Sequence, residues 1–205
     1  MPTTTAFSTP CWRAPERLAR AFWLACLLAL GAHAAEPRNL VEQATIRHTA
    51  AGPLLDAKIA VELTPSLADA LARGITQPFV AELEISRPRK WWFSEDVLDV
   101  RRRVRLGYNL LLRTYLVETE ARSRSFAELG GALAALGTIE GWPLPERVEF
   151  RPGQNYEARL RLRIDTEALP KPLILGAFTS DKWELATPWY SWRFDGPATT
   201  DKPAP

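Results

Sequence analysis

Tryptophan and basic side chains gather in the segment Arg87-Pro88-Arg89-Lys90-Trp91-Trp92-Phe93. Arginine and tryptophan stack on sugars or on a partner's aromatic residues, and both are enriched at the centres of protein interfaces. Adjacent tryptophans in an extended segment point to opposite faces, so at most one indole can enter a core. We therefore predict a partner or ligand surface made of Arg89, Lys90, Trp91 and Trp92. The alternative is a loop that folds its indoles over one end of the sheets.

Arginine also recurs at every second position in two other segments, Arg101-Arg102-Arg103-Val104-Arg105 and Arg159-Leu160-Arg161-Leu162-Arg163. Such rows could bind an anionic partner, such as lipid headgroups or acidic glycans. We favour a solvated sheet face on which the arginines form ion pairs with acids of neighbouring strands, each contributing about 0.2–1 kcal/mol. The acids available for these pairs are Glu82, Glu84, Glu118 and Glu120.

Carboxylates are the remaining groups that could perform chemistry. Glycoside hydrolysis needs two carboxylates a fixed distance apart. The candidate acids are Glu95, Asp96, Asp99, Glu118 and Glu120. Because many acids in one chain offer such pairs by chance, a carboxylate-dependent hydrolase is the least favoured function. We expect the later tryptophans, Trp183, Trp189 and Trp192, to pack in the core or at the edge of the last strands.

Residues 1–34 are typical of a secretory signal. Arg13, Arg17 and Arg20 precede the apolar run Ala21–Gly31, and Ala32-His33-Ala34 fits a signal peptidase site. We predict cleavage after Ala34, or less favourably after Ala35, and export to the periplasm. The run is shorter than the about 20 residues of a membrane span, and the mature chain should contain no span. The alternative is an uncleaved signal that anchors the chain in the inner membrane.

Loss of residues 1–34 leaves 171 residues with 23 basic and 23 acidic side chains, which suits one domain with no general attraction to nucleic acid. Cys11 and Cys26 are removed, and His48 becomes the remaining histidine. Zinc sites built on Cys and His clusters, cysteine nucleophiles and triads without His48 are thereby excluded. Gly130-Gly131 does not match a phosphate-binding loop. We expect no metal or cofactor and no enzymatic activity.

Alternating apolar and polar residues predict antiparallel strands with one face on a core. Arg102 interrupts this alternation in one of them, and a hairpin turn is expected near Asn109–Arg113. The seven segments that we assign to strands are residues 55–63, 79–86, 98–108, 115–120, 156–165, 173–178 and 189–194.

Two short helices are expected between the strands. One begins with Thr64 as N-cap and Pro65 at the first position and ends at Gly74. The other begins at Ser125, with Glu128 completing a capping box, and ends at Gly137. We predict a mainly β protein, an antiparallel β-sandwich of about seven strands with two short covering helices. It would form a single domain over residues 35–195, followed by a disordered proline-rich tail over residues 196–205.

A series of landmarks in this order resembles the proteobacterial family called domain of unknown function 4390. The landmarks are Pro78-Phe79 through Glu84, the segment 87–93, Tyr108 with Arg113 and Tyr115, Leu136-Gly137 before Trp142-Pro143, Leu169-Pro170-Lys171-Pro172, Trp183, Trp189 and Trp192. The resemblance implies an exported protein, often encoded beside a membrane sensor histidine kinase. It implies no catalytic residue.

These observations favour a non-enzymatic interaction or accessory domain of the cell envelope, linked to a membrane sensor or another envelope protein as partner. A small-ligand or glycan-binding module that uses the same tryptophans is the alternative. The oligomeric state stays open.

Overall fold

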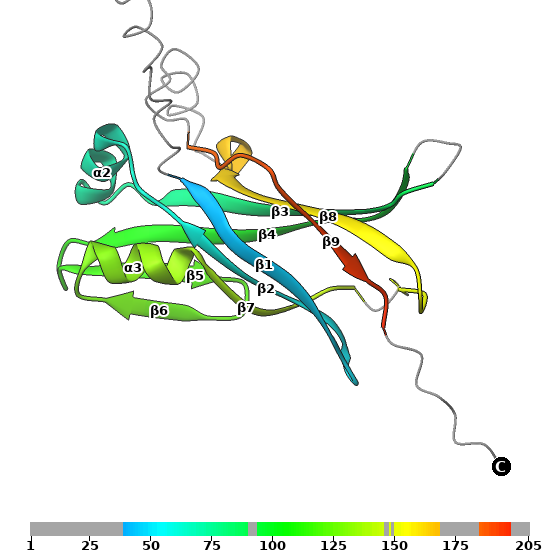
Figure 1. Ribbon diagram of the computed structural model, residues 1–205. Helices are drawn as coiled ribbons and strands as arrows, with labels where there is room; N and C mark the ends of the chain where they lie inside the picture. Colours follow the sequence, from blue (N-terminus) through cyan, green and yellow to red (C-terminus); the bar gives the residue numbers. More distant parts are fainter. Residues whose placement is uncertain (1–38, 90–93, 146–147, 149, 169–184, 198–205) are drawn as a thin grey trace, which may run out of the picture. The chain divides into compact units, whose positions relative to one another are not determined.

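A computed structural model of the chain describes residues 39–89, 94–145, 148, 150–168 and 185–197. All of these residues lie in one compact unit, Pro37–Pro205. Strands dominate this unit, as predicted (Figure 1). The strands are β1 (Leu40–Thr49), β2 (Gly52–Ala60), β3 (Gln77–Arg87), β4 (Glu95–Asn109), β5 (Thr114–Thr119), β6 (Ser123–Phe126), β7 (Thr138–Pro143), β8 (Asn155–Ile164) and β9 (Tyr190–Asp195). The helices are α2 (Pro65–Ala72), α3 (Leu129–Leu136) and the 3-10 turn η1 (Thr166–Ala168).

The strands form two antiparallel sheets. The larger sheet has six strands in the order β6-β5-β4-β3-β8-β9, and the smaller has three in the order β1-β2-β7. The smaller sheet and α3 lie on the same side of the larger sheet (Figure 1). The described residues therefore contain nine strands, where the sequence predicted about seven.

The core lies where the alternating apolar residues of the two sheets meet. On the central strand β3, Leu83 pairs with Val100 of β4 on one side and with Leu160 of β8 on the other. Leu55 and Ile59 of β2 belong to the same buried cluster as Leu83. Side chains on such a face exchange water for apolar contacts, which is the main source of stability in a domain of this size.

Strand β1 has an irregular pattern that the sequence analysis did not assign to a strand. Its pairing with β2 shifts register between Val41 and Gln43. The buried residues Val41, Ala44 and Ile46 consequently have spacings of three and then two. A β-bulge inserts one extra residue and breaks strict alternation, so a period-two search does not detect the strand.

The first helix agrees with its prediction. Thr64 is the N-cap of α2, its hydroxyl oxygen accepts the N–H of Leu67 at 3.4 Å, and Pro65 opens the helix. Gly74 follows the C-cap with φ of +81°, a conformation that glycine adopts without strain. In the part of the chain described here, no helix has both the length and the apolar character of a membrane-spanning segment.

The start of the second helix was predicted wrongly. Ser125 belongs to strand β6 and pairs with Leu116 of β5, so it cannot be the N-cap. Helix α3 begins at Leu129, and the side chain of its N-cap residue Glu128 makes no capping hydrogen bond. Gly137 ends the helix as expected. Pairing with β5 thus overrides the local capping signal.

The C-terminal predictions are only partly covered by the structure. Strand β9 confirms the predicted last strand, and Gly196 after it donates its N–H to the carbonyl of Gln154 at 2.9 Å. The predicted strand over residues 173–178, Trp183 and the tail from residue 198 lie outside the described residues.

Candidate functional site

The predicted surface of Arg89, Lys90, Trp91 and Trp92 is described at one residue. Arg89 is exposed, and its Nη2 lies 2.5 Å from Oε2 of Glu95. Arg87 pairs with the same carboxylate oxygen. Lys90, Trp91 and Trp92 lie outside the described residues, so this surface stays a prediction.

The two arginine rows form the ion pairs that the sequence predicted with Glu82 and Glu84. Glu82 is buried and accepts hydrogen bonds from Arg161 Nε at 2.6 Å and from Arg163 Nη2 at 2.8 Å. Glu84 accepts one from Arg159 Nε at 2.6 Å. Much of the charge in these rows is therefore compensated within the sheet.

Trp189 lies on the same face of the larger sheet. The guanidinium carbons of Arg159 and Arg161 lie 4.9 and 4.3 Å from its ring centroid. Cation–π contacts thus hold this indole against the arginine row, at the start of β9. Trp192 is half-buried and packs against the core, which confirms its predicted role in the last strand.

The structure describes all five candidate catalytic acids, and Glu118 is half-buried. Hydrogen bonds from Arg87 and then Arg89 lower the pKa of Glu95, despite the opposing effect of desolvation. Asp96, Asp99 and Glu120 are exposed. His48 is also exposed, and its ring lies 5.6 Å from that of Phe150. Within the described ranges, no group of three His, Cys, Asp or Glu residues could hold a metal ion.

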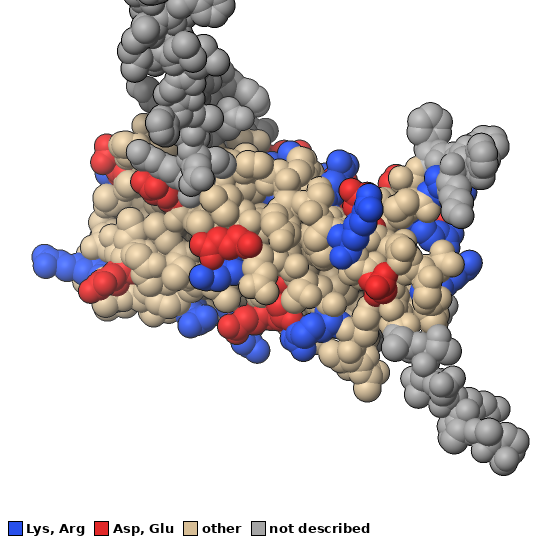
Figure 2. All heavy atoms as spheres, in the orientation of Figure 1, with Lys and Arg blue, Asp and Glu red and all other residues tan. Residues whose placement is uncertain are grey.

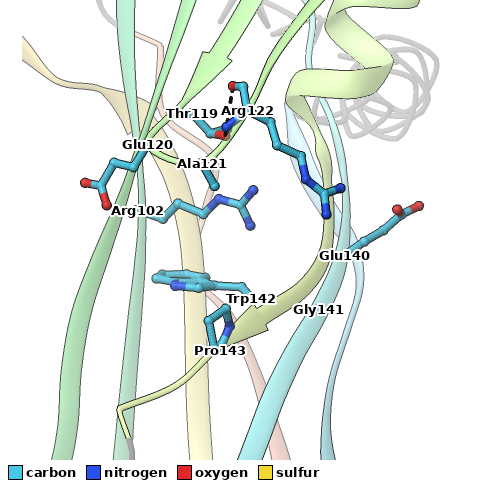
Figure 3. Close-up of a pocket in the computed structure, with 9 residues that line it drawn as sticks. All are labelled: Arg102, Thr119, Glu120, Ala121, Arg122, Glu140, Gly141, Trp142 and Pro143. Atoms are coloured by element: carbon cyan, nitrogen blue, oxygen red, sulfur yellow. Dashed lines mark hydrogen bonds between the residues drawn. The ribbon is translucent and has the colours of Figure 1, made fainter.

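A different site lies between the two sheets. Arg102 of β4 belongs to the side of the strand that also carries the buried Leu98 and Val104, so it faces inward. It lines a pocket of about 480 Å³ together with Arg122 and Trp142. The other lining residues are Thr119, Glu120, Ala121, Glu140, Gly141 and Pro143. The pocket therefore joins β4 and the β5–β6 turn of the larger sheet to β7 at the edge of the smaller sheet (Figure 3).

A short turn fixes the backbone that carries Arg122. The N–H of Thr119 donates to the carbonyl of Arg122 at 2.7 Å. The Thr119 hydroxyl accepts the N–H of Arg122 at 3.1 Å and also lies 3.1 Å from the Arg122 carbonyl. Three polar contacts between Thr119 and Arg122 hold this turn, so the backbone that carries the Arg122 side chain has a fixed position.

A bulge in β7 places Trp142. Leu55 of β2 pairs with Trp142, but Ala57 pairs with Ile139, so Glu140 and Gly141 together face Asp56 alone. Gly141 has φ of +57°. Its N–H donates to Oδ1 of Asp56 at 2.8 Å. The bulge turns this end of β7, which is the usual effect of an extra residue in one strand.

Two arginines, Arg102 and Arg122, dominate the electrostatics of the pocket among the described residues. Burial lowers the pKa of Arg102, and the charge of Arg122 lowers it further, while Glu120 acts in the opposite direction. Among the residues described, no carboxylate lies within 4.0 Å of either guanidinium.

Figure 3 shows how the side chains are arranged around this charge. Arg102 and Arg122 point into the same space above Trp142, whereas the carboxylates of Glu120 and Glu140 point away from it. On the face seen in Figure 2, basic and acidic side chains are interspersed. The pocket can therefore accept a negatively charged group through two guanidinium forks, beside the flat apolar surface of an indole.

This site was not among those predicted from the sequence, although the sequence contains one signal for it. Arg102 interrupts an otherwise apolar strand face, and a cation at such a position needs either a partner or a function. Arg122 and Trp142 carry no comparable signal, because only the turn and the bulge bring them near Arg102.

Comparison with known proteins gives one match. The model of a family described as Domain of unknown function (DUF4390) matches residues 38–193, which confirms the resemblance based on the sequence landmarks. No curated protein matches the chain, and no solved structure matches it.

Proposed function

We propose that this chain, which belongs to the DUF4390 family, is a non-enzymatic binding domain of the cell envelope that recognises an acidic sugar in the pocket of Arg102, Arg122 and Trp142. In this proposal the protein is exported, and its two sheets are the layers of a β-sandwich. The ligand enters where edge strand β7 of the smaller sheet faces β4 and the β5–β6 turn.

The observation that carries the proposal is the inward-facing charge of Arg102, which has no carboxylate within 4.0 Å among the described residues. Taking a charge out of water is costly unless it is paired, and the nearest charges include a second cation, Arg122. A carboxylate between the two guanidinium groups would receive charge-assisted hydrogen bonds from both and would remove their mutual repulsion.

Trp142 supports the proposal that the ligand bearing this carboxylate is a sugar. An indole offers a flat apolar face and a polar edge, which suits a pyranose ring with its apolar and hydroxyl-bearing sides. The pocket volume of about 480 Å³ lies within the range of small-ligand sites.

The pKa shifts of the described acids support binding rather than catalysis. The described carboxylates with a shifted pKa are Asp56, Glu82 and Glu95, and all three pKa values are lowered. A general acid for glycoside hydrolysis requires the opposite shift.

Calorimetric titration with a matched pair of disaccharides tests the proposal. Cellobiouronic acid and cellobiose differ by one carboxylate, and we expect the acid to bind and the neutral sugar to bind far more weakly. Arg102→Met should weaken binding of the acid by about 10- to 100-fold, since a hydrogen bond to a charged group contributes about 1.5–3 kcal/mol.

Arg105→Met is the control, because Arg105 is an exposed arginine of the same strand on the opposite face. This variant should bind like the unmodified protein. Equal binding of the two disaccharides, or an equal loss in the two variants, would contradict the proposal.

A further inference from the structure

The turn between β4 and β5 exposes three consecutive leucines. Leu110, Leu111 and Leu112 are 60%, 94% and 71% exposed. They are the exposed large apolar side chains among the described residues. Single exposed apolar residues are normal on a protein surface, but a contiguous apolar tip is typical of an interaction site.

The backbone of this leucine tip is held in place by its own side chains. Oδ1 of Asn109 accepts the N–H groups of Leu111 and Leu112, both at 3.0 Å. Arg113 closes the turn with φ of +52°, and Tyr108 and Tyr115 pair directly below it. Two backbone N–H groups at the tip therefore already have a hydrogen-bond acceptor. Polar groups that enter an apolar environment need such a partner.

Two cations and two tyrosines lie in the segments next to the tip. Arg113 and Arg73 are exposed, and no described carboxylate lies within 4.0 Å of either guanidinium. Arg73 is near because Leu110 packs against Gly74, where an added Cβ would lie 3.2 Å from Leu110 Cδ1. The half-buried rings of Tyr108 and Tyr115 lie 4.8 Å apart, in the strand positions that lead into and out of the turn, and pack against the core.

This order of side chains matches a bilayer surface. Apolar residues enter the acyl region, tyrosines sit at headgroup level, and arginines meet anionic phosphates. We propose that the leucine tip, Asn109–Arg113, inserts into an anionic phospholipid leaflet and that Arg73 and Arg113 bind its headgroups. The charge complementarity favours lipid over an apolar cavity in a partner protein, for which the two arginines would have no role.

A position-specific fluorophore on the full chain tests the insertion. Total binding to vesicles is unsuitable as a readout, because residues 1–34 contain an apolar run of their own. Cys11→Ser and Cys26→Ser provide a background in which Leu111→Cys can be labelled with an environment-sensitive nitrobenzoxadiazole dye. Ala51→Cys provides the control, since Ala51 is exposed at the β1–β2 turn.

With vesicles of phosphatidylcholine and phosphatidylglycerol, the dye at position 111 should shift to the blue and brighten, and the dye at position 51 should not. Replacing Arg73 by Gln and Arg113 by Asn should weaken the effect about fivefold for each cation removed. Asparagine is chosen at 113 because it tolerates the positive φ.

Dye at position 111 that keeps its aqueous spectrum would overturn the proposal and would favour a protein partner for the tip. Equal shifts at positions 111 and 51 would also overturn it. A shift of the same size with phosphatidylcholine alone would show that Arg73 and Arg113 do not bind anionic headgroups. The result is independent of the sugar pocket, because none of these positions lines it.

Discussion

Oδ1 of Asp56 accepts the backbone N–H of Gly141 at 2.8 Å, so strand β2 directly holds the bulge that positions Trp142. The same carboxylate pairs with Arg47 of β1, and hydrogen bonding to Arg47 is the main reason that its pKa is lowered. One acid therefore connects all three strands of the smaller sheet to the candidate pocket.

Asp56→Ala should remove both contacts, lower the free energy of unfolding by about 1–2 kcal/mol and weaken sugar binding. Asp56→Asn should cost less, because the amide oxygen can still accept the N–H of Gly141. Urea titration followed by tryptophan fluorescence measures both changes. Glu42→Ala removes an exposed pair with Lys58 and should be nearly neutral. Equal losses for Asp56→Ala and Asp56→Asn would show that the bulge does not depend on this bond.

Stability should fall in acid. The pKa values of Asp56, Glu82 and Glu95 are lowered in the folded protein, so each group adds stability above its unfolded pKa and loses it as pH falls through the folded pKa. We expect a free energy of unfolding that is level near neutral pH and declines below about pH 4.5. Urea titrations across this range measure the decline. A free energy that stays constant to about pH 3 would contradict the expectation.

Glu82 should contribute more to stability than any other acid that pairs with an arginine of the two rows. Burial raises its pKa, but hydrogen bonds from Arg163 and Arg161 outweigh that effect and the net pKa is lowered. Glu82→Gln should destabilise the fold by about 2–4 kcal/mol, because arginines packed around a buried carboxylate lose their counter-charge. Glu84→Gln, two positions along the same face and more exposed, should cost at most about 1 kcal/mol. Chemical denaturation of the two variants should separate them clearly, and equal effects would refute this ranking.

Much of the larger sheet follows from its sequence, because β8 alternates between buried apolar residues and charged ones, and β3 has the same apolar alternation at Phe79, Ala81, Leu83 and Ile85. The missed parts have a common physical cause. The bulges at Val41–Gln43 and at Glu140–Gly141 add residues to one strand and destroy the alternation that reveals it. Ser125 carries a capping signal, but hydrogen bonds to a neighbouring strand decide its conformation.

The candidate pocket was harder to predict than the sheets. Its three main residues, Arg102, Arg122 and Trp142, are separated in sequence and come from two sheets. Their proximity depends on a turn held by Thr119 and on a bulge held by Asp56, and neither has a local signature. Only the interruption at Arg102 was visible in the sequence. Side chains that face the core are normally apolar, so a charged residue among them breaks the alternation of the strand.

Gly137 should tolerate no side chain. A Cβ at this position would lie 2.0 Å from the carbonyl oxygen of Ile59, and the N–H of Ile59 already donates to the carbonyl of Gly137 at 2.8 Å. Gly137→Ala must therefore push helix α3 away from β2 and should destabilise the protein by more than about 3 kcal/mol. Gly130→Ala is the matched control, with nothing within 4 Å of its Cβ, and should add up to about 1 kcal/mol through helix propensity. Thermal unfolding followed by circular dichroism would show the opposite shifts, and a neutral Gly137→Ala would mean that the helix and strand can separate freely.

Arg102 should lower the stability of the ligand-free protein while it enables binding. Arg102 is half-buried beside Arg122, with burial and that second charge both acting against its protonated form. Replacing a half-buried cation that has no described carboxylate within 4.0 Å by an apolar residue removes a desolvation cost. Arg102→Leu should therefore raise the free energy of unfolding by about 1 kcal/mol or more and weaken binding of the acidic disaccharide by about 10- to 100-fold. Arg105→Leu, on the exposed face, should change neither quantity appreciably. Denaturation and calorimetry on the same preparations measure the two effects together. A destabilised Arg102→Leu variant would show that the arginine has a structural partner and would argue against a ligand site between the sheets.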